Sequence, residues 1–308
     1  MRPMAQMAKR RANNTIRVPA SDRALLAVNV AVLMVFTLTI LLPLIYVLAA
    51  SFSSAPAVVA GRVYLWPVDF SLDGFTAVFG SSQIGSGYLN SVFYMAAGTL
   101  FSLAATIMAA FPLSCKELYG RRVLMVFFTF TMMFSGGLIP TYLVVRDLRM
   151  TNTRWALLVP GALSVYYMIV ARTYFQTTIP DELAEAADLD GCSDAGFLVR
   201  VVLPLSGPLI ATLALFFAVT QWNGYFDALI YLNDQSKYPL QIVLRNILIL
   251  NATDSGMISD VEALARRQGM KELLKFSLIV VASAPMLAIY PFVQKYFVRG
   301  IMIGAIKG

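Results

Sequence analysis

Apolar residues fall into six long runs along the chain, separated by polar segments. Each run reaches about 20 residues, which as an α-helix rising about 1.5 Å per residue crosses about 30 Å of hydrocarbon. The runs must be helical, because lipid offers backbone N–H and C=O groups no partners. We therefore predict an all-α integral membrane protein with six transmembrane helices, at residues 24–50, 88–114, 123–145, 155–175, 205–232 and 273–293.

Shorter apolar pieces lie between these runs. The stretch "SLDGFTAVF" at residues 71–79 begins with polar residues and places Phe75, Val78 and Phe79 on one face, which predicts a short interfacial helix. The stretch "LQIVLRNILIL" at residues 240–250 is apolar but too short to span, so it is re-entrant, interfacial or packed on the outer mouth. Gly136, Gly137 and Pro140 inside the third run predict a kink or close packing.

Basic residues suggest the orientation of the chain. An even number of spans places both termini on one side, and the basic N-terminal segment indicates the cytoplasm. We expect a cytoplasmic segment 1–23, a six-helix membrane domain 24–297 and a cytoplasmic tail 298–308, although the outer turn at residues 146–154 runs against the charge rule. The N-terminal cluster is interpreted as a juxtamembrane anchor rather than a nucleic-acid arm; it comprises Arg2, Lys9, Arg10, Arg11, Arg17 and Arg23.

Composition excludes several classes of site. The chain has no histidine and two cysteines, Cys115 and Cys192, in 308 residues. A disulfide framework, a zinc or haem site and a histidine-based triad are therefore poorly supported. We expect no metal, no cofactor and no nucleic-acid partner, and no Walker motif is present for ATP hydrolysis.

The most charged segment, "IPDELAEAADLDGCSDAGFLVRVVLPLSGPL" at residues 179–209, follows the fourth run. Pro180 and the acidic residues after it favour a helix start, and Gly191 favours its end. Ser193 or Asp194 can begin a second short helix that stops at Pro204. Because the second helix carries apolar residues that a solvated loop does not need, the segment is interpreted as a docking knob on the cytoplasmic face.

This segment resembles the EAA loop of ABC importer permeases. The signature fits at every position and spacing: Glu185, Ala186, Ala187, three residues, Gly191, nine residues, Val201, one residue, Leu203 and Pro204. The stretches "QWNGYFDALIYL" and "RGIMIGAIKG" further resemble the maltose-type carbohydrate permeases, in the oligosaccharide branch. The similarity extends from about residue 24 to the C-terminus.

The resemblance implies a mechanism. Such a permease pairs with a second homologous permease, and its EAA loop between helices 4 and 5 forms a coupling helix on an ABC ATP-binding subunit dimer. An external or periplasmic substrate-binding protein delivers the carbohydrate, and the complex lies in the bacterial inner membrane. In these terms Glu185 pairs with a basic group of the ATPase, Gly191 allows the tight turn, and Lys307 lies in a tail that reaches the ATPase dimer.

Polar groups at membrane depth are costly and often functional. Trp222, Asn223, Tyr225 and Asp227 in the fifth run fit a sugar path, because aromatic faces stack on sugar rings and amide or carboxylate groups bond hydroxyls. Helix–helix contacts and an aromatic interface belt explain them as well. The arginines of the outer segments face an anionic sugar such as a uronate oligosaccharide, are solvated, or bind the acidic rim of the docking protein; they are Arg146, Arg149, Arg154, Arg245, Arg266 and Arg267.

Other functions remain open from the residues alone. A secondary transporter needs coupling-ion groups deep in the spans, and Asp227 is the sole candidate identified. A membrane-embedded enzyme needs clustered catalytic residues, which are not evident. Uptake of another solute, such as a polyol or a sugar phosphodiester, cannot be separated from oligosaccharide uptake on this sequence.

Overall fold

The computed structural model describes residues 19–250, 269–288, 290 and 291. Every regular element in these residues is helical, which confirms the predicted class. Helix α2 (Ala20–Ser51) and helix α5 (Ser82–Ser114) are each long and apolar enough to cross a membrane. Two bent helix pairs pass the same test if each pair is one span, so the described residues offer between two and four candidate spans. The six predicted spans are therefore supported in part.

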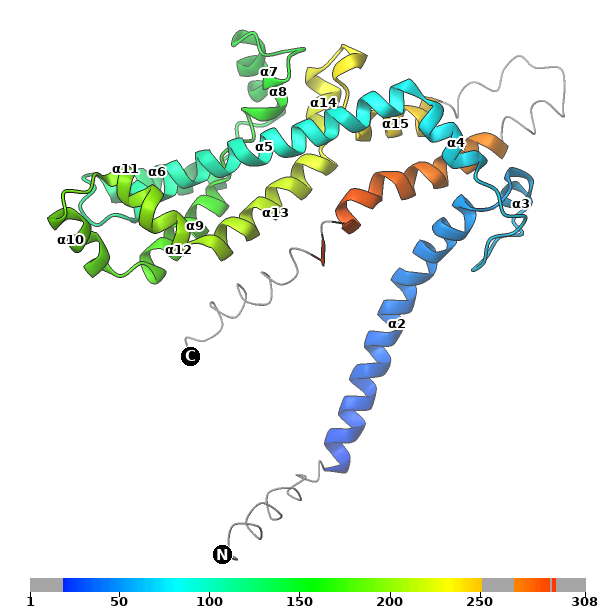
Figure 1. Ribbon diagram of the computed structural model, residues 1–308, viewed down its shortest axis with the longest axis horizontal. Helices are drawn as coiled ribbons and strands as arrows, with labels where there is room; N and C mark the ends of the chain where they lie inside the picture. Colours follow the sequence, from blue (N-terminus) through cyan, green and yellow to red (C-terminus); the bar gives the residue numbers. More distant parts are fainter. Residues whose placement is uncertain (1–18, 251–268, 289, 292–308) are drawn as a thin grey trace, which may run out of the picture.

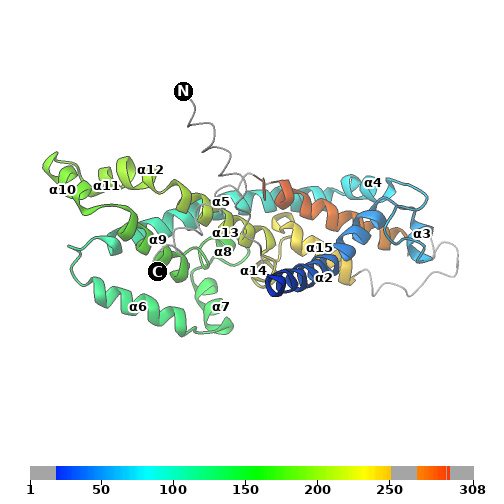
Figure 2. The ribbon, with the colours of Figure 1, turned by 90° about the horizontal axis from the view of Figure 1, so that it is seen from below.

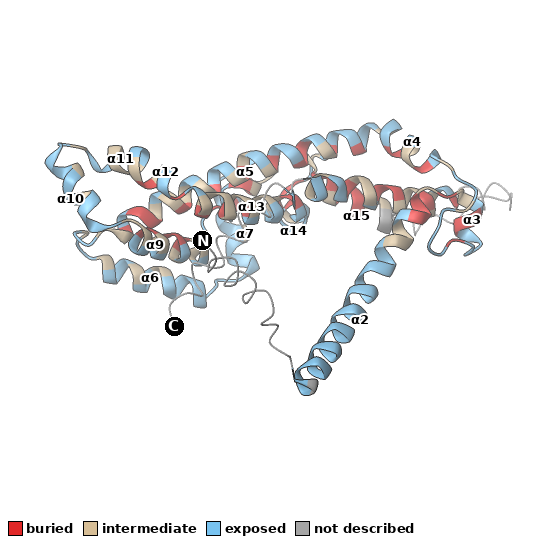
Figure 3. Cartoon of the chain, turned by 60° about the horizontal axis from the view of Figure 1, so that its bottom comes forward, coloured by how far each residue is buried: buried red, intermediate tan, exposed pale blue. Residues whose placement is uncertain are grey.

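Helix α2 stands apart from the other helices (Figure 1). None of its most apolar window is buried inside the chain, and only its C-terminal end packs, through Ala49 and Ala50. Figure 3 shows the helix exposed along nearly its whole length. Its apolar surface must be covered by lipid or by another protein, because water does not solvate it favourably.

The segment after α2 is compact. Helix α3 (Ala55–Val59) is capped by Ser54, whose hydroxyl accepts a bond from the Ala57 N–H. Helix α4 (Asp73–Gly80) forms where the sequence predicts a short amphipathic helix. Gly74 of α4 lies so close to the last described helix, residues 269–288, that a Cβ would come 2.1 Å from the Ser277 Oγ.

Helix α5 is the centre of the packed body. Its small residues Gly98, Ser102, Thr106 and Ala110 recur every four positions and are buried, a pattern that lets helix backbones approach closely. Helix α13 (Gly207–Asn223) packs along α5, as does helix α9 (Val165–Thr178). Figure 3 shows the buried residues gathered where these helices meet.

The third predicted span is broken. Helix α6 (Arg121–Met133) and helix α7 (Leu138–Asp147) meet at a bend of 115°. Gly137 sits between them with φ +86°, a conformation that favours glycine, and Pro140 has no N–H to continue a helix. The predicted kink is confirmed, and it is sharp enough to split the helix. Figure 2 shows α7 turned away from α6.

The fourth predicted span is also interrupted, which its continuous apolar pattern at 155–175 did not indicate. Helix α8 (Trp155–Leu158) ends before Pro160 and Gly161, and α9 begins only at Val165. The proline removes a backbone donor and the glycine is a poor helix former. Helix α9 itself has 14 residues, fewer than a single straight span requires.

Further short helices lie near the N-terminal end of α5 and the C-terminal end of α13. Helix α14 (Phe226–Tyr231) follows α13 after a break at Gly224, so the predicted fifth span is not one straight helix. Helix α15 (Leu240–Leu250) packs on α5, where Leu240 and Val243 join a core with Ile84 and Trp222. This apolar stretch therefore packs on the helical body, and its position relative to the membrane stays a prediction.

Candidate functional site

The segment that resembles the EAA loop, called the EAA loop below, lies at one end of the molecule, as α10 and α11 in Figures 1 and 2. Helix α10 (Asp181–Leu189) begins directly after Pro180 and carries Asp181 and Glu182 in its first turn. Carboxylates there interact favourably with the positive end of the helix dipole. The Asp181 carboxylate forms an ion pair with Lys116, on the loop between α5 and α6, and this partner raises the Lys116 pKa.

Gly191 ends α10 through a left-handed turn. Its φ is +72°, and the Gly191 N–H donates to the Asp188 carbonyl at 3.0 Å. The Cys192 N–H donates to the Ala187 carbonyl at 2.9 Å. These two bonds are the Schellman pattern, which satisfies carbonyls that a helix end otherwise leaves without partners. The predicted helix end at Gly191 is thus found, with a backbone reason for glycine.

The second half of the loop returns to the helical body. The Ser193 hydroxyl caps helix α11 (Asp194–Phe197) by accepting from the Gly196 N–H at 3.2 Å. The predicted stop at Pro204 is wrong by one residue, because the helix continues through the π-turn η1 (Leu198–Val202) into α12 (Leu203–Leu205). The wider turn, in which the Leu203 N–H donates to the Leu198 carbonyl, relieves the crowding that proline causes in an α-helix.

The two halves of the loop differ in burial. In α10, Glu185 and Ala186 are exposed and Ala187 is half-buried. After α11, Val202 is 1% exposed within a core that includes Phe111 and Leu209, and Phe197 packs against that core. The motif residues Val201 and Leu203 are half-buried beside it, and Pro204 is exposed. The acidic half of the loop is therefore exposed, whereas the apolar half packs into the helical core.

The loop is linked to α13 by a sharp bend. The segment Asp194–Leu205 meets Gly207–Asn223 at 84°, with Ser206 fully buried between them. The C-terminal end of α5 braces the same region, since three of its last carbonyls accept bonds from other helices: Leu113 from Arg172, Ser114 from Gln176 and Cys115 from Arg121. The loop is thus joined to α13 by the bend and to α5 through the core that Val202 shares with Phe111.

The predicted sugar-path residues do not form one cluster. Trp222 is 2% exposed, and its Nε1 donates to the Ala282 carbonyl at 3.1 Å. Asn223, Tyr225 and Asp227 are exposed instead, and the Asn223 amide bonds the Val219 carbonyl within its own helix. A role of these four residues in a sugar path stays a prediction, and Lys307 lies outside the described residues.

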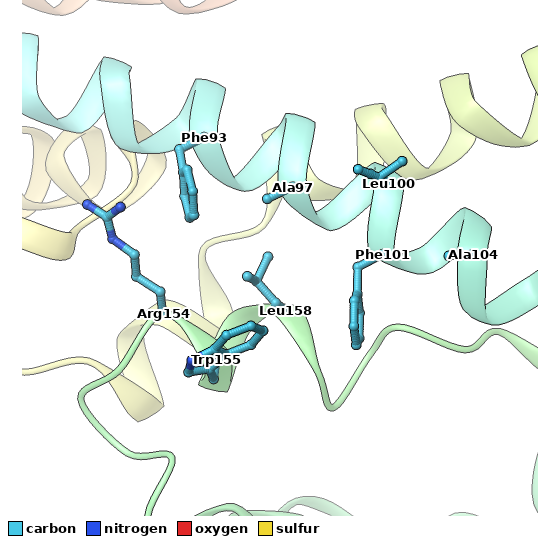
Figure 4. A pocket seen from close by; sticks show the side chains of 8 residues that line it. All are labelled: Phe93, Ala97, Leu100, Phe101, Ala104, Arg154, Trp155 and Leu158. Carbon is cyan, nitrogen blue, oxygen red and sulfur yellow. The ribbon is translucent and has the colours of Figure 1, made fainter.

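An apolar groove, which the sequence did not indicate, runs between α5 and α8 (Figure 4). It encloses about 420 Å³ and is lined mainly by Phe93, Ala97 and Phe101 of α5 and by Trp155 and Leu158 of α8. Arg154 closes one end, with its guanidinium carbon 4.6 Å from the centre of the Phe93 ring. The sequence signal for this groove was the four-residue spacing of Phe93, Ala97 and Phe101. The same spacing is also typical of lipid-facing helices.

A polar network closes the end of the bundle opposite the EAA loop. Asn90 of α5 donates to the carbonyls of Ser236 and Tyr238, and Lys237 donates to the Asn152 carbonyl at 2.9 Å. Bonds from Ser236 and Lys237 lower the pKa of Asp234 to about 2. The carboxylate therefore stays ionised at physiological pH, and this outer turn, η2 (Gln235–Lys237), keeps its bonds.

The described residues contain no group of three or more histidine, cysteine or acidic side chains placed to hold a metal. The functional interpretation therefore depends on the EAA loop and its setting. Residues 105–303 match the family model described as "Binding-protein-dependent transport system inner membrane component". The chain belongs to this family.

Similar proteins place this permease more closely. It is 43% identical over 277 residues to the polygalacturonan/rhamnogalacturonan transport system permease protein YtcP of Bacillus subtilis, covering 90% of this chain and 96% of the relative. It is 41% identical to Protein LplC of the same organism over 271 residues, covering 87% and 90% of the two chains. Its structure resembles a chain from a bacterial ABC transporter involved in the import of the acidic polysaccharide alginate, with TM-score 0.83, 34% identity and coverage of 91% and 99%.

Proposed function

We propose that this permease is one transmembrane subunit of an ATP-driven, binding-protein-dependent importer of oligosaccharides in the bacterial inner membrane. It pairs with a second permease, an ABC ATP-binding dimer and an external substrate-binding protein, and both of its termini lie in the cytoplasm. The observation that carries the proposal is the EAA loop, whose acidic helix α10 is exposed at one end of the bundle while α11 and η1 are rooted in the core.

Coupling follows from this geometry. Exposed Glu185 is free to pair with a basic group of the ATPase, and exposed Ala186 leaves room for close approach. Closure of the ATPase dimer moves α10, and the Gly191 turn transmits the displacement to α11. Because Val202 locks this segment into the core beside α5 and α13, the displacement reaches the spans and changes the access of the central cavity.

The exposed apolar surface of helix α2 is an argument for a second permease as a partner. It presents apolar side chains on all sides and buries none of its most apolar window within its own chain. A helix that is apolar all round is covered on all sides in the native state. We assign part of that cover to the partner permease and the remainder to lipid.

The substrate class proposed is an acidic oligosaccharide. One similar protein, YtcP, is named for the transport of polygalacturonan and rhamnogalacturonan. The similar structure comes from an importer of the acidic polysaccharide alginate. Both likenesses extend over about nine tenths of this chain. The alternatives are a neutral oligosaccharide, another solute imported by the same mechanism, and a secondary transporter, which would work without ATP.

The coupling role is tested with Glu185→Gln in the assembled complex, reconstituted in proteoliposomes. Loss of a desolvated charge pair costs about 2–5 kcal/mol, so ATP-driven uptake should fall at least tenfold with the complex still assembled. Glu182→Gln, an exposed carboxylate of the same helix, is the matched control and should retain uptake. Normal uptake in Glu185→Gln, or uptake by wild type without ATP, would contradict the proposal.

The substrate class is tested by transport with the binding protein encoded beside this permease. Oligogalacturonate and oligoalginate should be taken up in competition with each other, whereas neutral malto-oligosaccharides should compete weakly. Preferred uptake of the neutral sugar would replace the acidic class by a neutral one. Uptake of neither would remove the oligosaccharide assignment and leave the family membership intact.

A further inference from the structure

The loop between α3 and α4 presents large apolar side chains to the surroundings. Tyr64, Leu65 and Trp66, here called the aromatic tip, are 74%, 47% and 80% exposed. A contiguous exposed apolar patch of this kind marks a site of interaction with another protein or with the membrane. The neighbouring Val63, by contrast, is 2% exposed and belongs to a core.

The base of this loop is firmly fixed. Arg62 and Asp69 form an ion pair at 3.0 Å across the two sides of the tip. The Val68 N–H donates to the Ser53 hydroxyl at 3.0 Å, which ties the loop to the end of α2. These contacts hold the two sides of the tip together, which lowers the cost of ordering it when a partner binds.

The position of the tip places it beyond the hydrocarbon. Residues 92–113 of α5 are mainly apolar and span about 33 Å as a helix, which matches the hydrocarbon thickness. The preceding turns of α5 carry the exposed polar residues Gln83 and Ser86 and therefore extend past it. Figure 1 shows α3 and its loop beyond the start of α5, at the end opposite α10.

A tip that lies outside the lipid, opposite the EAA loop, fits a soluble protein partner on the outer face. Trp and Tyr are the side chains that most often carry binding energy in protein interfaces. The Arg62–Asp69 pair borders the tip with charge, as the polar rim of an interface does. The family description itself specifies transport that depends on a binding protein, and such a protein reaches this face from outside.

We propose that the aromatic tip of Tyr64, Leu65 and Trp66 is an anchor of the docking surface for the substrate-binding protein. This inference rests on the proposed function. The rings insert into the surface of the binding protein when it docks, and the fixed base of the loop sets their position.

The test uses the complete transporter in lipid nanodiscs and, as the probe, the purified substrate-binding protein of the source organism, whose stimulation of the wild-type ATPase is measured first. Trp66→Ala should weaken docking of this protein by about tenfold or more, as expected for a central aromatic anchor, and Tyr64→Ala should also weaken it. Tyr119→Ala removes a ring that is 99% exposed at the opposite end of the molecule, and should leave docking unchanged. Size-exclusion chromatography verifies assembly, and Trp66→Gln replaces Trp66→Ala if that complex does not assemble.

The outcomes separate the two proposals. A wild-type complex that neither binds the protein nor is stimulated by it would overturn the proposed function. A stimulated wild type with equal affinity in the Trp66 and Tyr64 variants would overturn the docking anchor alone. Quenching of Trp66 fluorescence by lipids brominated on their acyl chains, taken as the difference between wild type and Trp66→Phe, would place the tip in the membrane and also overturn it.

Discussion

Gly191 shows how one backbone angle can set the shape of the coupling segment. Its φ of +72° lies in the left-handed region, and a Cβ at this position would meet no atom within 4 Å. Space is therefore not the constraint, and only the backbone conformation selects glycine. The residue was predictable as a helix end from the sequence, because capping chemistry is local.

Replacement of Gly191 should accordingly damage coupling through strain. Gly191→Ala should destabilise the α10–α11 turn by about 1–2 kcal/mol, the cost of a left-handed L-residue, visible as faster hydrogen exchange at residues 181–197. Gly191→Pro should abolish transport and the stimulation of ATPase activity while the protein still inserts. Gly85→Ala, also in open space but without a positive φ, serves as the control and should change neither property. Normal coupling in Gly191→Pro would contradict the role of the loop.

At the scale of helices, features set by neighbouring residues in the sequence were predictable, whereas contacts between distant residues were not. The kink at Gly136 and Gly137 and the short helix α4 were predictable, because glycine, proline and amphipathic spacing act within a few residues. The burial of Trp222 was not, since its Nε1 finds its partner at Ala282, 60 residues away. The groove beside α8 likewise exists only because α8 returns to α5 in space.

The contact between α4 and the last described helix gives an element-scale prediction. Gly74→Ala places a methyl group 2.1 Å from the Ser277 Oγ and 2.9 Å from the Leu273 Cγ. Overpacking of this kind costs about 1–3 kcal/mol, so the variant should unfold at lower temperature in detergent. Gly80→Ala, at the other end of α4 with nothing within 4 Å, should be tolerated. If Ser277→Ala does not partly restore the Gly74→Ala variant, the steric explanation fails.

The C-terminal end of α5 gives a second prediction at the scale of helices. Arg172 donates to the Leu113 carbonyl at 2.8 Å, which satisfies a carbonyl without an intrahelical partner and places positive charge at the negative end of the helix dipole. Arg172→Ala should therefore lower stability by about 1 kcal/mol, after allowance for its partial exposure. Thermal unfolding in detergent measures the change, with the exposed Arg122→Ala as a control. Equal stability of the two variants would show that the bond contributes nothing.

At the scale of the whole molecule, the EAA loop and the aromatic tip lie at opposite ends of α5 (Figure 1). This separation is what an importer needs, because ATP is inside the cell and the substrate-binding protein is outside. In the sequence both segments fall between the predicted spans, since charge and length determine such assignments. It could not predict the broken spans in detail, because neighbouring helices decide where a break is stabilised.

The orientation is testable with the two native cysteines. Cys115 and Cys192 both lie near the EAA loop and are free and half-buried. A membrane-impermeant maleimide applied to intact cells should therefore leave the wild-type chain unlabelled. Thr76→Cys, on the exposed surface of α4, should be labelled from outside. Labelling of the wild type in intact cells would reverse the proposed orientation.

The length of α2 has a consequence for the lipid around the complex. Its apolar part, residues 24–50, measures about 40 Å as a helix, whereas the hydrocarbon is about 30 Å thick. To hide this excess by tilt alone, the helix must incline about 40° from the bilayer normal, at the upper end of the usual range. A thinner bilayer would tilt it further and a thicker one would raise it. Hydrophobic mismatch thus makes the membrane footprint of α2, and with it the spacing of any subunit that it contacts, depend on the acyl-chain length of the host lipids.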